Sequence, residues 1–165
     1  MPRALVTLLL LLALCVPLRV HAAALPTSVV VSWVYDGDTF KTDEGDKVRL
    51  LGIDTPEHEA SGRDRFYLRL GVDTATLRRV SKEALQFVIR HAKGKRVTLT
   101  YDHTTYDKHG RLLAYVTLPD GRMLNRLLLE EGLAAVFRKF PFPLKEAFLE
   151  VEQRARAKKL GLWRE

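Results

Sequence analysis

The stretch SVVVSWVYDGDTFKTDEGDKVRLLGI, residues 28–53, has the pattern of short β-strands joined by tight turns. Its strand-like parts are rich in β-branched and aromatic residues, which favour extended backbone. The turns at 36–38 and 43–46 contain the aspartate and glycine residues that tight bends prefer. The stretch therefore predicts a β-meander at the start of the domain.

Helix and strand patterns alternate in the rest of the chain. Apolar residues recur at helical spacing in three segments, and two further segments have strand character. The expected helices are 72–93, 123–131 and 144–160, and the added strands are 96–102 and 111–118. This element order predicts a β-rich α+β fold, an OB-type five-stranded Greek-key barrel with about three helices. A β-rich α+β sandwich remains the alternative.

The first residues have the features of a secretory signal peptide. Arg3 precedes an apolar run at 4–14, and small residues suited to cleavage follow. We expect a signal peptide at 1–23 and a single domain at 24–165, exported to the periplasm or secreted. The apolar run is too short for a membrane-spanning helix, so no membrane span is expected. The single cysteine, Cys15, lies in this segment, so the exported domain is expected to contain no disulfide.

The chain is basic, with a formal net charge of +7. Removal of residues 1–23 takes away Arg3 and Arg19 but no acidic residue, which leaves +5. A basic exported domain suggests a polyanionic partner such as nucleic acid. A solvated basic face without such a partner is the alternative reading.

Acidic residues are concentrated in two short segments of this basic chain. Asp36 and Asp38 are two positions apart, so on extended backbone their side chains face the same side. Turn chemistry alone could account for that pair. The segment RLLGIDTPE, residues 49–57, adds Asp54 and Glu57. Carboxylates gathered at the ends of neighbouring strands repel one another unless a cation or a proton lies between them.

Two arginines accompany these acids. Arg49 opens RLLGIDTPE, and Arg111 follows the turn in YDKHGRLLAY, residues 106–115. That turn could be an ordinary hairpin loop. If the two strands are neighbours, however, the two guanidinium groups suit the oxygens of a phosphodiester.

The motifs DGDT (36–39), RLLGIDTPE (49–57) and DKHGR (107–111), in this order, resemble the signature segments of the thermonuclease, or staphylococcal-nuclease-like, family. The resemblance continues through GLA (132–134) and AKKLGLW (157–163). It implies an OB-type barrel with three helices and a calcium-dependent phosphodiesterase. The implied reaction is cleavage of the P–O5′ bond of DNA and RNA, with single-stranded substrate preferred and 3′-phosphate ends as products.

The resemblance also implies a Ca²⁺ site. Asp38 and Asp54 would be its side-chain ligands, and the carbonyl of Thr55 would be a further oxygen ligand. Asp36 would order metal-bound water. Hard oxygen donors of this kind are what Ca²⁺ prefers.

Three residues are implied to be catalytic. Glu57 would accept a proton from the attacking water or orient it. Arg49 and Arg111 would stabilise charge on the five-coordinate phosphorus.

Substrate contacts are expected from Lys108, His109 and Phe137. His109 and Phe137 stand where the family often has tyrosines, which puts the grip on the product and the rate in doubt. The segment 58–79 is longer than the family pattern leads us to expect. It is either a mobile flap near the substrate or a decorated loop, and its candidate arginines are Arg63, Arg65 and Arg69.

The sequence thus predicts an exported, calcium-dependent, sugar-non-specific nuclease that acts as a monomer. The alternative is a non-catalytic OB-type nucleic-acid-binding module. Trp33 and Trp163 are expected to be packing aromatics rather than platforms for bases.

Overall fold

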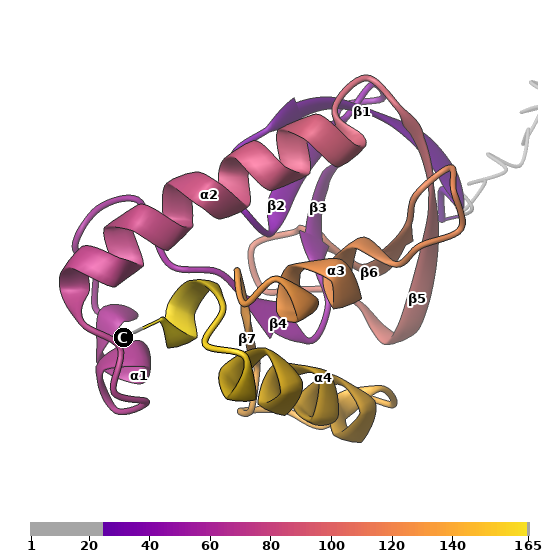
Figure 1. Cartoon of the computed structure of the whole chain (residues 1–165). Coiled ribbons are helices and arrows are strands. Elements are labelled where there is room, and N and C mark those ends of the chain that lie inside the picture. Colours follow the sequence, from indigo (N-terminus) through magenta and orange to yellow (C-terminus); the bar gives the residue numbers. More distant parts are fainter. Residues whose placement is uncertain (1–24, 165) are drawn as a thin grey trace, which may run out of the picture.

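Five strands close into a barrel in the computed structural model, which describes residues 25–164 (Figure 1). The order of strands around the barrel is β1-β2-β3-β6-β5. The predicted signal peptide, residues 1–23, and Cys15 lie outside the described residues. The predicted OB-type α+β barrel is confirmed. The barrel strands are β1 (Ser28–Val34), β2 (Thr39–Thr42), β3 (Lys47–Leu50), β5 (Arg96–Tyr106) and β6 (Leu112–Thr117).

The strands β1, β2 and β3 form the meander that the opening stretch predicts. Both of its pairings are antiparallel, whereas β3 pairs with β6 in parallel. Gly45 in the turn between β2 and β3 has a φ of 101°, which glycine adopts without steric cost. Its N–H donates to the carbonyl of Thr42 at 3.2 Å. This tight turn sets the register in which Thr39 faces Arg49.

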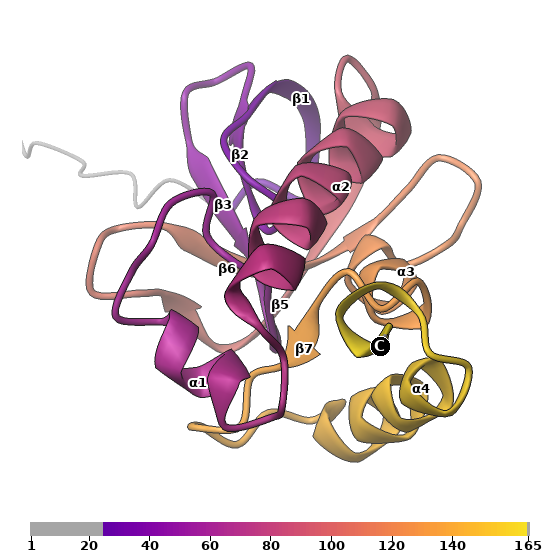
Figure 2. The ribbon, with the colours of Figure 1, turned by 60° about the vertical axis from the view of Figure 1, so that its left-hand side comes forward.

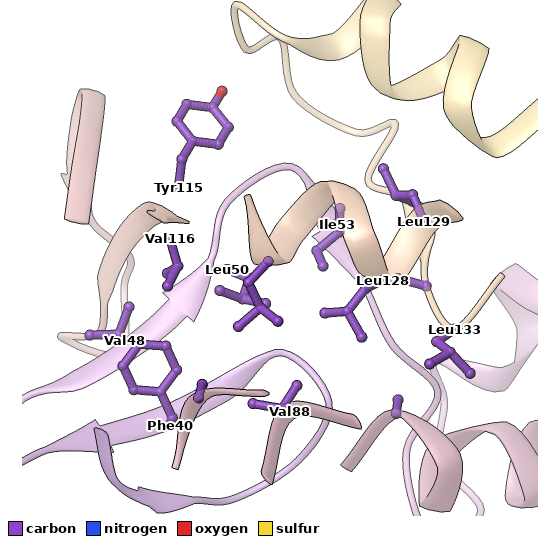
Figure 3. Packing of buried hydrophobic residues seen from close by; sticks show 14 of the residues in the cluster. Phe40, Val48, Leu50, Ile53, Val88, Tyr115, Val116, Leu128, Leu129 and Leu133 are labelled. Atoms are coloured by element: carbon purple, nitrogen blue, oxygen red, sulfur yellow. The ribbon is translucent and has the colours of Figure 1, made fainter. Parts of the chain in front are cut away.

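Alternate residues of the strands fill the barrel interior. Phe40, Val48, Leu50 and Val116 are at most 1% exposed, and Figure 3 shows them gathered together. Residues between them, such as Lys41, face outward. This period of two is expected for strands with one buried face.

Helix α2 (Thr74–Ala92) buries an apolar stripe against the barrel. It begins at Asp73, whose carboxylate accepts the N–H of Thr76 at 3.0 Å, a standard N-cap. It ends before Gly94, whose φ is 75° and whose N–H donates to the carbonyl of Val31 at 2.8 Å. The end of the helix is therefore fastened to β1 just before the chain enters β5, and Figures 1 and 2 show the helix beside β1.

The remaining elements form a second layer below the barrel. Strands β4 and β7 pair with each other, and α3 and α4 pack together. The predicted number of about three longer helices is confirmed, and the five-residue helix α1 is an addition. No helix within residues 25–164 is both long and apolar enough to cross a membrane. These elements are β4 (Ile53–Asp54), α1 (Asp64–Leu68), α3 (Leu124–Glu130), β7 (Ala135–Val136), α4 (Lys145–Ala157) and the 3₁₀ turn η1 (Gly161–Trp163).

The two tryptophans have different environments. Trp163 packs against the core cluster, with the Arg156 guanidinium 3.7 Å from its ring centroid, as predicted. Trp33 is 54% exposed, so the prediction that it packs inside is wrong. The reason is register: Trp33 lies opposite the outward-facing Lys41, after an irregularity in β1 between Val31 and Trp33.

A buried glutamate joins α4 to β7. Glu152 is 1% exposed and accepts the N–H of Val136 at 2.7 Å. It also accepts from Arg138 at 2.6 Å and from Arg156 at 2.9 Å. Because β7 pairs with β4, Glu152 indirectly fixes the strand that carries Asp54.

Glu152→Ala is expected to lower the free energy of unfolding by about 3 to 5 kcal/mol, since it leaves two arginines and a buried N–H without their acceptor. Urea denaturation of the purified variant measures this. Glu150→Ala is the matched control, because Glu150 forms an exposed pair with Arg154 one turn away. Its expected loss is below about 1 kcal/mol. Equal losses for both variants would show that Glu152 is not an anchor.

Candidate active site

The bend between β1 and β2 brings two aspartates against α2. The N–H of Asp38 donates to the carboxylate of Asp36 at 2.9 Å. Between them, a Cβ on Gly37 would lie 2.6 Å from the Cβ of Ala84 and 2.9 Å from the side chain of Thr55. Only glycine allows this close approach. The bend therefore packs Asp38 against the start of the segment that follows β4.

Arg49 bridges two buried carboxylates. Its Nη1 contacts Oδ1 of Asp38, and its Nη2 lies 2.6 Å from Oδ1 of Asp54. Asp38 also accepts the N–H and the hydroxyl of Thr55 at 2.8 and 3.0 Å. Asp38, Asp54 and Thr55 are each at most 3% exposed. The structure thus brings together Asp38 and Asp54, the two predicted side-chain ligands, with Thr55 and with Arg49, one of the predicted catalytic arginines.

Glu57 lies at the exposed edge of this cluster. Its carboxylate is 3.2 Å from Nη1 of Arg63, and its side chain is 35% exposed. Its carbonyl accepts from Nη1 of Arg78 on α2 at 2.6 Å, while Nη2 of Arg78 pairs with Asp64 at 2.6 Å. Glu57 is therefore held by its backbone and keeps an accessible carboxylate.

The segment 58–79 contributes side chains to the cluster. Nη2 of Arg63 contacts Oδ1 of Asp54, and the hydroxyl of Tyr67 donates to Oδ2 of Asp54 at 3.0 Å. Tyr67 is fully buried on α1. Arg65 and Arg69 are exposed. Of the three candidate arginines in this segment, Arg63 is therefore the one that contacts the carboxylates.

Tyr67 and Arg78 were missed by the sequence reasoning. The available signal was weak: both lie in the segment that departs from the family pattern, and α1 has only five residues. A helix this short has too few residues for a helical periodicity to be recognised, and nothing in its sequence reveals which acid the buried Tyr67 meets.

The other predicted residues lie apart from the carboxylates. Arg111 donates through Nε to Asp107 at 2.7 Å, and this aspartate also accepts the N–H groups of His109 and Arg111. Lys108 and His109 are exposed on that turn. The condition that the two arginine-bearing strands be neighbours is met, because β3 and β6 pair. Within residues 25–164, however, the guanidinium of Arg111 forms its ion pair with Asp107 and none with Asp38, Asp54 or Glu57.

Phe137 follows β7, next to the β4 strand that carries Asp54. Its N–H donates to the carbonyl of Gly52 at 2.9 Å, and its ring lies 5.8 Å from that of Phe140. Phe140 is 58% exposed. The two rings form an accessible aromatic pair at the edge of the second layer.

The buried acids have opposed pKa shifts. Burial, and after it the charge of Asp38, raise the pKa of Asp36 to about 7. Burial alone would also raise the pKa of Asp38, but the Arg49 guanidinium and the Thr55 N–H bring it below its ordinary value. Burial and then the Asp38 charge raise the pKa of Asp54. The negative charge that the carboxylates of the cluster could carry therefore exceeds the positive charge that its arginines supply.

Asp36→Asn is expected to stabilise the calcium-free protein as the pH rises. Unfolded Asp36 ionises near its ordinary value of 3.8, whereas folded Asp36 keeps its proton until about pH 7. The wild type therefore loses stability between these values, and a neutral asparagine does not. The advantage of the variant should grow by about 1 to 2 kcal/mol between about pH 5 and pH 8.5, after allowance for partial exposure.

Urea denaturation in a chelator, at both pH values, measures that advantage. The asparagine carbonyl can still accept the Asp38 N–H, so the bend is preserved. A stability difference that is the same at both pH values would contradict the raised pKa.

The donor set suits a hard cation. Asp38, Asp54, Glu57 and the Thr55 carbonyl offer oxygen atoms only, as Ca²⁺ requires. No preformed group of three metal-binding His, Cys, Asp or Glu side chains occurs within residues 25–164. Arg63 contacts both Asp54 and Glu57, so its positive charge lies between these two carboxylates. Arg49 also contacts both aspartates, so the residues fit Ca²⁺ provided that the two guanidinium groups make room for it.

Comparison with known proteins gives a consistent result. Residues 47–165 match the family model described as staphylococcal nuclease homologue. An uncharacterized protein of Methanocaldococcus jannaschii is 37% identical over 142 residues, which cover 79% of this chain and 68% of that protein. The thermonuclease of Staphylococcus intermedius is 36% identical, covering 82% and 76%. The thermonuclease of Staphylococcus hyicus is 33% identical, covering 79% and 72%.

Proposed function

The chain belongs to the staphylococcal nuclease family and is a nuclease, and we propose that it is an exported, calcium-dependent enzyme that hydrolyses both DNA and RNA. The observation that carries the proposal is the buried group Asp38, Arg49 and Asp54, with Glu57 accessible at its edge. An acid cluster and a guanidinium beside one accessible carboxylate suit the hydrolysis of a phosphodiester.

In the proposed site, Asp38, Asp54 and the Thr55 carbonyl hold Ca²⁺, and Asp36 orders water bound to it. The bound cation would neutralise a non-bridging phosphate oxygen and position the scissile group. The support for this assignment is the all-oxygen donor set and the excess of acid in the cluster.

The side chains of this chain perform the remaining steps. Glu57 accepts a proton from the attacking water or orients it. Arg49, which lies beside Asp38 and Asp54, presents positive charge to the phosphate oxygens. Arg111 stabilises the same charge once it leaves Asp107, and the P–O5′ bond breaks to leave a 3′-phosphate.

Substrate is gripped by Lys108, His109 and Phe137. Lys108 and His109 are exposed on the turn that Asp107 braces, where they can contact phosphate. Phe137, together with Phe140, can stack on an unpaired base. These contacts support a preference for single-stranded substrate.

Digestion of single-stranded DNA and of RNA by the purified protein, with added Ca²⁺ or with a chelator, tests the proposal. The expected result is cleavage of both polymers that requires Ca²⁺ and leaves ends from which phosphatase releases 3′-phosphate. Binding without cleavage at any Ca²⁺ concentration would instead indicate a non-catalytic nucleic-acid-binding module. Undiminished cleavage in chelator would overturn the metal assignment.

Export is the part of the proposal that rests on residues 1–23 alone. Their basic start, apolar run and small residues before position 24 support a cleaved leader. The mass of the intact protein recovered outside the cytoplasm is expected to match a chain that begins at residue 24. Recovery of the uncleaved chain from the cytoplasm would contradict export.

Arg63 is expected to compete with Ca²⁺ for the acids. Arg63→Ala removes the guanidinium that lies between Asp54 and Glu57, so the dissociation constant for Ca²⁺ should fall about five- to tenfold, equivalent to about 1 kcal/mol. Isothermal titration calorimetry without nucleic acid measures it. Arg65→Ala, an exposed arginine two positions away, is the matched control. Unchanged affinity in Arg63→Ala would show that the guanidinium does not occupy the cation position.

A further inference from the structure

The outer face of β1, β2 and β3 carries exposed aromatic rings among lysines. We define the aromatic–lysine face by two rings and three lysines. Trp33 is 54% exposed and Tyr35 is 42% exposed. Large exposed rings are costly to leave in water and commonly mark a binding surface. The members of the face are Trp33, Tyr35, Lys41, Lys47 and Lys93.

Strand register places these side chains on one side of the sheet. Trp33 lies opposite Lys41, and Lys41 lies opposite Lys47. Directly opposite residues in antiparallel strands project from the same face. Their neighbours Phe40 and Val48 are fully buried in the barrel. Trp33, Lys41 and Lys47 therefore form a row across three strands that lie side by side in Figure 2.

Two of the three lysines of this face, Lys47 and Lys93, lie over its aromatic rings. Nζ of Lys47 lies 5.0 Å from the Tyr35 ring centroid, and Nζ of Lys93 lies 4.8 Å from that of Trp33. Within residues 25–164, none of the three lysines forms an ion pair with a carboxylate. Such cation–π contacts leave the ammonium donors exposed to an incoming anion.

The face is continuous with the candidate active site. Thr39 and Arg49 are paired, and each lies two residues from a lysine of the face, Thr39 from Lys41 and Arg49 from Lys47. The hydroxyl of Thr39 donates to Asp38 at 3.0 Å, and Arg49 contacts the same carboxylate. Two residues of strand span about 7 Å. A nucleic-acid strand bound at Arg49 would therefore need to extend only about 7 Å to reach the lysine row.

Acidic residues limit the face at its far end. Asp43, Glu44 and Asp46 form the turn between β2 and β3, beyond Lys41 and Lys47. Asp43 is engaged with the N–H of Val30 at 3.1 Å. Phosphates would be repelled past this turn. The face is thus a short track with one open end, and that end is the candidate active site.

We propose that the aromatic–lysine face binds the single-stranded nucleic acid that extends from the active site, with bases stacked on Trp33 and Tyr35 and phosphates held by Lys41, Lys47 and Lys93. Unpaired bases expose the flat surfaces that stack on aromatic side chains, whereas a duplex hides them. The proposal extends the proposed function, because it assumes that the substrate of the adjacent site is nucleic acid.

Trp33 supplies a direct reporter of binding. In chelator, to prevent cleavage, a thymidine oligonucleotide of about 20 nucleotides is expected to quench the fluorescence of the wild type but not of Trp33→Phe. Trp33→Ala should weaken binding by about tenfold or more, since one stacked base is worth about 1 to 3 kcal/mol. A duplex of equal length should quench little.

The lysines are tested by the salt dependence of affinity. Lys41→Ala with Lys47→Ala should reduce the slope of log affinity against log salt by about 1.4, because each phosphate contact on a single strand contributes about 0.7. The matched control is Lys82→Ala with Lys158→Ala, which removes the same charge from exposed positions on α2 and just beyond α4. An equal change of slope in both pairs would overturn the proposal. Trp33→Ala should leave binding to heparin, which has no bases to stack, unchanged. Equal weakening of its binding to heparin and to the oligonucleotide would also overturn the proposal.

Cleavage assays separate this inference from the proposed function. With Ca²⁺, Trp33→Ala is expected to cleave a dinucleotide as the wild type does, but to lose about tenfold in kcat/KM on the long oligonucleotide. Loss on the dinucleotide as well, or no loss on either, would overturn the inference. If no variant cleaves anything but the quenching of Trp33 by single strands persists, the inference stands and the proposed function fails.

Discussion

Asp38→Asn is expected to reduce nuclease turnover by more than two orders of magnitude and to abolish the response to Ca²⁺. Asp38 is the residue on which the cluster converges: it contacts Arg49 and accepts from Thr39 and from both donors of Thr55. Asparagine keeps the shape but removes the charge that a cation and Arg49 both need. Loss of one positioned charge in a site of this kind typically costs about 10²- to 10³-fold in rate.

The same substitution is expected to lower the free energy of unfolding by about 3 kcal/mol, because it leaves Arg49 with Asp54 as its remaining carboxylate partner. Turnover must therefore be measured at a temperature at which circular dichroism shows the variant folded. Calcium titration calorimetry of the folded variant separates loss of the metal from loss of the fold. Asp120→Asn is the control, since Asp120 forms an exposed pair with Arg122. Calcium-dependent cleavage by folded Asp38→Asn would sink the site assignment.

Glu57→Gln is expected to reduce turnover by two or more orders of magnitude while leaving stability almost unchanged. The carboxylate is 35% exposed, and its described ion-pair partner is Arg63, so its loss costs the fold less than about 1 kcal/mol. General acid–base groups typically contribute about 10²- to 10⁴-fold in rate. A large effect on rate with little effect on stability is the combination that distinguishes a catalytic group from an anchor such as Glu152.

Single-turnover cleavage of single-stranded DNA at saturating Ca²⁺ measures the chemical step directly. Glu59→Gln is the matched control, because Glu59 is an exposed glutamate two positions along the same segment. The Ca²⁺ affinity of Glu57→Gln should change less than that of Asp38→Asn. Near-normal turnover of Glu57→Gln would show that Glu57 takes no part in the chemical step.

Several features of the site could be predicted because they are local in the chain. Asp36, Asp38, Arg49, Asp54 and Thr55 lie within 20 positions, on β3 and β4 or on the bends next to strands, so strand alternation and turn chemistry favour placing them together. The barrel itself followed from the same alternation, with glycine at the turn between β2 and β3. The family resemblance then supplied expected roles that neither alternation nor charge could specify.

The contributions of distant segments could not be predicted in this way. Arg63 and Tyr67 reach Asp54 from α1, and Arg78 fixes the Glu57 carbonyl from α2. Each depends on how a helix packs against the barrel, which the periodicity of its own sequence does not specify. Arg111 shows the same limit: β6, the strand that follows it, pairs with β3, but its side chain turns to Asp107 within its own loop.

The sequence by itself determined the strand alternation, the glycines that permit the bends, and the acids and arginine that those bends bring together. These follow from interactions between residues that are near one another in the chain. Only the tertiary structure decided which arginine from a distant segment contacts the acids, and which aromatic rings are exposed to water. Arg63 occupies the space between Asp54 and Glu57, and Trp33 points outward over Lys41 after the irregularity in β1. Side-chain direction at such positions depends on packing and register across the whole barrel, and no local pattern contains that information.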